Sequence, residues 1–62
     1  MKIIAVDNFG RETVNDLLVC ENVNSYYGTF MVDQLNEILS SDYAPRFYKL
    51  VENNYKLYKY EE

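Results

Sequence analysis

One stretch decides the fold, residues 24–39, NSYYGTFMVDQLNEIL. Asn24 is a favourable helix N-cap, and Val23 before it is an apolar residue of the kind that staples a helix start. The apolar side chains that recur at helical spacing on one face are Tyr27, Met31, Leu35 and Ile38, with Phe30 and Leu39 beside them. Because Ser40-Ser41-Asp42 and Pro45 oppose continuation, this stretch predicts a helix over about residues 24–40.

Gly28 lies inside the predicted helix, where glycine costs about 1 kcal/mol relative to alanine. We expect a compensating benefit, which is close approach of the helix backbone to a sheet.

Strands are predicted on both sides of the helix. Residues 2–7 form a short β-branched run, and the following turn contains Gly10. Residues 13–20 indicate a second strand, although LLVC at its end does not alternate; a helix over residues 11–20 is the competing interpretation. Residues 46–52 and 55–60 indicate two further strands, joined by an Asn53-Asn54 turn.

These elements predict a single α+β domain over residues 1–62, with two layers and the order ββαββ. A right-handed crossover through the helix places the third strand parallel to the second, with the first between them. The predicted strand order is therefore 2-1-3-4 in a mainly antiparallel sheet, with the helix on one face.

The composition argues against catalysis and against cofactors. The chain contains no histidine and one cysteine, Cys20, so an internal disulfide is excluded and the usual zinc ligand sets cannot be assembled. Cys20 has no histidine to activate it and is interpreted as a small buried residue. We expect no enzyme, no catalytic residue, no metal and no cofactor. Without a signal-like or membrane-spanning run, the expected location is the cytoplasm.

Charge and aromatic residues are unevenly distributed along the chain. Two basic and seven acidic residues give −5 over residues 1–45, and four basic and three acidic residues give +1 over residues 46–62. Alternation in the last two predicted strands places one candidate interaction surface on an open sheet face, formed by Phe47, Lys49, Val51, Lys56, Tyr58 and Tyr60. Cross-strand packing, a protein interface that includes a homodimer, and stacking of single-stranded bases all remain open. The overall acidity disfavours nucleic acid.

Acidic residues offer a further alternative. Asp33 and Glu37 are four residues apart on the predicted helix, where a solvated face is the simplest interpretation. A DNA mimic would use the carboxylates of Asp7, Glu12, Asp16, Glu21, Asp33 and Glu37.

Three runs carry a resemblance to a known group: residues 21–24 (ENVN), 46–51 (RFYKLV) and 55–58 (YKLY). With the helix between them, the chain resembles small uncharacterised proteins of phages and other mobile elements, although Gly28 stands where alanine is expected. The resemblance implies a compact strand–helix–strand domain in the cytoplasm of a bacterial or phage-infected cell and, by analogy, a regulator or inhibitor of host machinery. The sequence therefore predicts a non-enzymatic module that binds an unidentified protein partner, with no membrane association.

Overall fold

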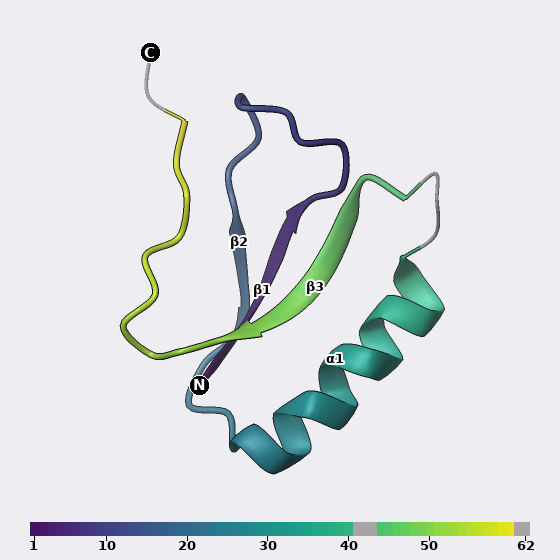
Figure 1. Ribbon diagram of the computed structural model, residues 1–62, viewed down its shortest axis with the longest axis vertical. Coiled ribbons are helices and arrows are strands. Elements are labelled where there is room, and N and C mark those ends of the chain that lie inside the picture. Colours follow the sequence, from purple (N-terminus) through teal and green to yellow (C-terminus); the bar gives the residue numbers. More distant parts are fainter. Residues whose placement is uncertain (41–43, 61–62) are drawn as a thin grey trace.

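A computed structural model describes residues 1–40 and 44–60 of the chain. Strands β1 (Lys2–Asp7) and β2 (Leu17–Cys20) precede helix α1 (Ser25–Leu39), and strand β3 (Arg46–Val51) follows it (Figure 1). One helix packs against a three-stranded antiparallel sheet, so the predicted α+β class is confirmed.

The sheet has the order β2-β1-β3, with β1 antiparallel to both neighbours. Strands β2 and β3 therefore run in the same direction on either side of β1, as predicted for the first three strands. The β-branched run in β1 supplies the centre of the core, because Ile3 and Ile4 are both 0% exposed. Ala5, Val6 and Val23 complete the buried apolar set among the described residues.

The predicted fourth strand, residues 55–60, is wrong. The turn at Asn53-Asn54 forms, since the Tyr55 amide donates to the Glu52 carbonyl at 3.0 Å, but the following segment does not pair with β3. It crosses to the β2 side of the sheet (Figure 1). There the Asp16 amide donates to the Tyr58 carbonyl at 2.9 Å. We call residues 55–60 the tail segment.

The outer edge of β3 cannot accept a fourth strand because α1 already occupies it. The Asn36 amide nitrogen donates to the Tyr48 carbonyl at 2.8 Å, and the Tyr48 amide donates to Asn36 Oδ1 at 2.8 Å. Ser40 Oγ donates to the Arg46 carbonyl at 2.9 Å. These side chains take the backbone groups that a neighbouring strand would use.

Strand β2 is shorter than predicted, covering residues 17–20 and not 13–20, and the alternative helix over 11–20 does not form. Its register on β1 is irregular. Cys20 lies opposite Ile3 and Leu18 lies opposite Ile4, so Val19 is the extra residue of a β-bulge.

Helix α1 spans Ser25–Leu39 between caps at Asn24 and Ser40, in agreement with the predicted range of about 24–40. Asn24 Oδ1 accepts the amide of Tyr26 at 2.8 Å and that of Tyr27 at 3.4 Å, which confirms the cap. Gly28 is buried, and a Cβ there would lie 2.8 Å from Leu50 Cδ1 and 2.9 Å from Val23 Cγ1. The predicted close approach of the helix to the sheet is therefore confirmed.

The apolar face identified from helical spacing is mostly not the face that packs on the sheet. The less exposed residues of the helix are Gly28, Val32, Leu35 and Asn36. The predicted apolar face keeps only Leu35 inside and leaves five exposed residues: Tyr27, Phe30, Met31, Ile38 and Leu39. Two contacts set the rotation of the helix and thereby the face that packs on the sheet. They are the close approach at Gly28 and the hydrogen bonds between Asn36 and the Tyr48 backbone.

A carboxylate fastens the tail segment. Asp16 Oδ2 accepts the Tyr58 amide at 2.9 Å and the Tyr55 hydroxyl at 3.3 Å. We expect Asp16→Ala to raise amide exchange at Tyr58 by about 10-fold or more, because hydrogen bonds to charged groups contribute about 1.5–3 kcal/mol. Glu12→Ala is the matched control, since Glu12 holds the tail through its backbone carbonyl. Hydrogen exchange by NMR measures both, and equal exchange in the two variants would contradict this attachment.

Candidate apolar interaction groove

An apolar groove lies between β2 and α1, on the side of the sheet that faces the helix. Its floor is Ile3, which is fully buried, and its volume is about 540 Å³. One wall is formed by Val19 and Cys20 of β2, and the other by Met31, Gln34, Leu35, Ile38 and Leu39 of α1. None of these side chains carries a formal charge at neutral pH, so the groove suits an apolar occupant.

The bulge in β2 shapes this groove. Consecutive residues of a regular strand point to opposite faces of the sheet. Because Val19 is the bulged residue, both Val19 and Cys20 line the groove. Cys20 is therefore not fully buried as expected; it is a partly exposed free thiol in the groove wall.

The described part of the chain exposes much apolar surface for its size. Among the described residues, thirteen large hydrophobic side chains are exposed, whereas five hydrophobic residues are buried. The accessible surface of 4728 Å² exceeds the roughly 4,200 Å² of a compact monomer of this size. Four of the thirteen, Val19, Met31, Ile38 and Leu39, line the groove together, and a contiguous exposed apolar patch of this kind marks an interaction site.

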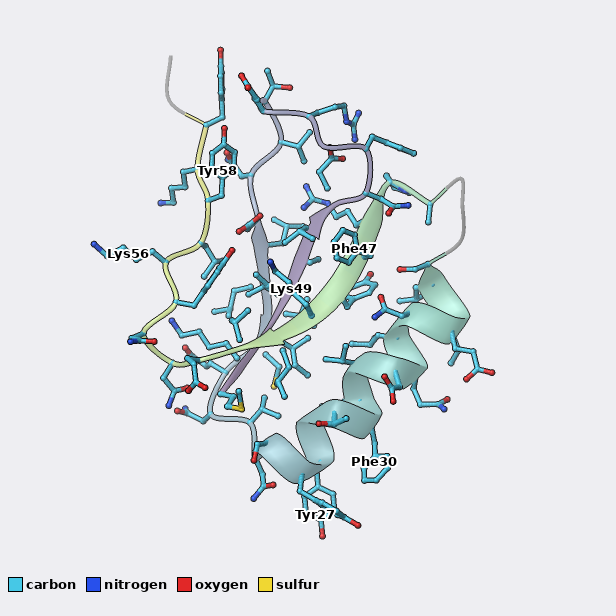
Figure 2. All side chains as sticks on the ribbon, viewed as in Figure 1. Tyr27, Phe30, Phe47, Lys49, Lys56 and Tyr58 are labelled. Carbon is cyan, nitrogen blue, oxygen red and sulfur yellow. The ribbon has the colours of Figure 1, made fainter. Side chains whose placement is uncertain are left out.

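The predicted interaction surface is divided in the structure. Phe47, Lys49 and Val51 alternate along β3 with Tyr48 and Leu50, which face α1, so the three project from the opposite face. Figure 2 shows Lys56 on the tail segment pointing away from the sheet.

Of the six predicted surface residues, Lys49 and Tyr58 line one cavity of about 450 Å³, whose lining includes several charged side chains. Tyr60 is exposed on the tail segment, with its amide donating to Asn15 Oδ1 at 2.6 Å. The Lys49 ammonium lies 5.4 Å from the centre of the Tyr55 ring, so its charge is already stacked within the chain.

Two of the three carboxylates that line this cavity have hydrogen-bond partners within the protein. Asp7 Oδ1 accepts the Arg11 guanidinium at 2.6 Å, and Asp7 Oδ2 accepts the Arg11 amide at 2.6 Å. Asp16 holds the tail segment. Two of the six carboxylates proposed for a DNA mimic thus have partners inside the protein.

The side-chain hydrogen bond from Arg11 lowers the pKa of Asp7 to about 2, against an opposing contribution from desolvation. The same contact raises the pKa of Arg11 above its usual value. A carboxyl whose pKa is depressed by folding stabilises the native state above its unfolded pKa, near 4. This contribution is lost as the pH falls from about 4 toward the folded value of about 2.

We therefore expect the Asp7 carboxyl to titrate near a pKa of 2 and Arg11→Gln to return it toward 3.8. An NMR titration of the side-chain carboxyl carbon measures this change. Lys56→Gln removes an exposed cation on the tail segment and should leave the Asp7 pKa unchanged. A wild-type pKa near 3.8 would contradict the contact.

The groove combines residues that the sequence pattern treated separately. The sequence places the helix residues that line the groove on one apolar face but does not show that this face borders a groove. The sequence feature that could have predicted the groove is the unbroken apolar run LLVC in β2. Apolar and polar residues stop alternating where a bulge turns two neighbouring side chains to the same face.

In the described part of the chain, no cluster of three candidate metal ligands occurs, and no helix is long and apolar enough to cross a bilayer. No family model matches the chain, and no curated protein or solved structure matches it.

Proposed function

We propose that this protein is a non-enzymatic protein-binding module whose binding surface is the apolar face formed by β2 and α1. One observation carries the proposal: the helix packs through Gly28 and its neighbours and leaves its apolar side chains outside. Ile38 is 74% exposed and Leu39 is 54% exposed at the groove wall. Burying such side chains against another polypeptide contributes about 25 cal/mol per Å² of apolar area.

A role as a regulator or inhibitor in a phage or mobile-element setting is part of this proposal and rests on the sequence resemblance. A single-stranded nucleic acid binder has less support, because the cavity that holds Lys49 and Tyr58 is lined by three carboxylates (Asp7, Glu12 and Asp16) and two cations (Lys49 and Arg11). Phosphate contacts need an excess of basic residues.

A photo-crosslinking amino acid placed at Ile38 tests the proposal in cells. We expect it to form covalent adducts with a polypeptide, because Ile38 projects into the proposed interface. The same amino acid at Phe47 is the control, since Phe47 is exposed on the opposite face of the sheet. Adducts at Ile38 that are no more abundant than those at Phe47 would overturn the proposed function.

A further inference from the structure

We infer that the apolar face of α1 and β2 binds the same face of a second copy of this chain, forming a two-fold symmetric homodimer. This inference rests on the proposed function and names the occupant of the groove. Its support comes from residue spacing on α1, from the area that the face offers and from the position of charges around it.

The spacing on α1 fits helix pairing. Tyr27, Met31, Gln34 and Ile38 are separated by four, three and four residues, which is the spacing of a two-helix seam. We call these four residues the α1 stripe. Three of them are apolar and 43–74% exposed, although α1 already packs on β3 with a different face. The stripe is therefore an additional packing surface.

The area of this face is within the range of a stable dimer interface. Six side chains that line the groove or lie beside it are 43–74% exposed: Leu17, Val19, Tyr27, Met31, Ile38 and Leu39. At roughly 200 Å² for each fully exposed side chain, they present about 650 Å². A standard interface buries about 600–1,000 Å² on each partner.

A second copy also fits the distribution of charge. Each chain carries −4, so self-association requires a contact surface that keeps like charges apart. The α1 stripe contains no charged residue, and the acidic residues Asp33 and Glu37 lie at other positions around the helix. Two copies can therefore bury the stripe without placing carboxylates opposite each other.

Pairing through the edge of β2 is less favourable for a second copy. Among the described residues, no hydrogen bond from outside the β1–β2 ladder reaches the backbone of residues 17–20. The outer edge of β2 therefore has backbone groups available for pairing with another strand. An antiparallel pair of β2 strands centred between Leu18 and Val19 would place Asp16 of each copy opposite Glu21 of the other. Like charges directly opposite each other destabilise a sheet. The α1 stripe is the surface that avoids this conflict.

The size of the chain gives an independent reason for self-association. A domain of 62 residues buries only about 60% of its unfolded surface and is marginal alone. Since the described core contains only five buried hydrophobic residues, a dimer would supply apolar burial that the monomer lacks.

Sedimentation equilibrium of the full chain tests the inference. We expect a dimer with a Kd on the order of 1–10 μM, and Ile38→Glu should weaken it by about 100-fold or more because a carboxylate would be buried unpaired. Ile38→Ser is a milder variant with the same expected direction. Phe47→Glu is the matched control and should leave the Kd unchanged. Circular dichroism at low protein concentration verifies that each variant is folded.

Mixing charged variants identifies the occupant as a second copy. We expect Ile38→Glu to form a heterodimer when mixed with either Ile38→Lys or Met31→Lys, depending on which residue faces Ile38 across the two-fold axis. Restored dimer in one mixture supports the inference. Failure of both mixtures, a wild-type monomer at about 100 μM, or equal weakening by Phe47→Glu would overturn it. If the wild type is monomeric while crosslinks from Ile38 reach another protein, this inference fails and the proposed function stands.

Discussion

Ile4→Ala is expected to remove most of the stability of the protein. Ile4 is 0% exposed in the central strand, between Leu18 on β2 and Lys49 on β3. Truncating a buried isoleucine to alanine costs about 2–5 kcal/mol. A chain of 62 residues has a free energy of unfolding of only about 3–9 kcal/mol. Urea denaturation should therefore show a large decrease in the midpoint or a substantial unfolded population without denaturant.

Ile38→Ala is the matched control, because it removes the same atoms from a side chain that is 74% exposed. At protein concentrations well below the proposed dimer Kd, its free energy of unfolding should change by no more than about 0.5 kcal/mol. At higher concentrations, loss of self-association should lower its apparent stability relative to the wild type. Equal losses for Ile4→Ala and Ile38→Ala at low concentration would contradict the observed core.

The features that local sequence signals specify were predicted well. The β-branched run before Asp7 forms β1, Asn24 caps α1, and the Asn53-Asn54 turn is present. Each of these depends on residues within a few positions of one another, so backbone propensity and capping are sufficient to predict it. The first three strands also have the predicted order, because a crossover through one helix leaves few alternatives.

The position of the tail segment could not be predicted in the same way. Two apolar runs joined by Asn53-Asn54 are typical of a hairpin, and the sequence contains no local signal against one. The hairpin is prevented by Asn36, which is twelve residues from Tyr48 and occupies its backbone groups. An asparagine inside a helix gives no indication of this role until the helix is placed beside the sheet.

The candidate site shows the same limit. The sequence shows the apolar spacing on α1, but spacing alone does not show whether that face packs on the chain's own sheet or binds another molecule. Two contacts decide the matter: Gly28 permits close approach at one side of the helix, and Asn36 fixes the rotation. The sequence pattern assigns the interaction surface to residues of the C-terminal region because it predicts an open sheet face there. The structure brings Lys49 and Tyr58 of that set to one cavity.

Gly28→Ala is expected to destabilise the protein even though alanine favours a helix by about 1 kcal/mol over glycine. The new methyl group would lie 2.8 Å from Leu50 Cδ1 and 2.9 Å from Val23 Cγ1, which is closer than carbon atoms pack. Val23 is 9% exposed and is tied to the first residue, because its amide donates to the Met1 carbonyl at 2.8 Å. We expect a net loss of about 1–3 kcal/mol, measured by urea denaturation.

A double-mutant cycle with Leu50→Ala separates the steric cost from the helix propensity. Leu50→Ala removes the atom nearest to the new methyl group, so Gly28→Ala should cost about 1–2 kcal/mol less in that background than in the wild type. The propensity gain is the same in both backgrounds, and the difference therefore reports the contact between α1 and β3. Thr29→Ala, at an exposed neighbouring position, should show no coupling to Leu50→Ala. If Gly28→Ala stabilises the wild-type chain, the helix does not approach the sheet as closely as the structure shows, and the exposed α1 stripe loses its explanation.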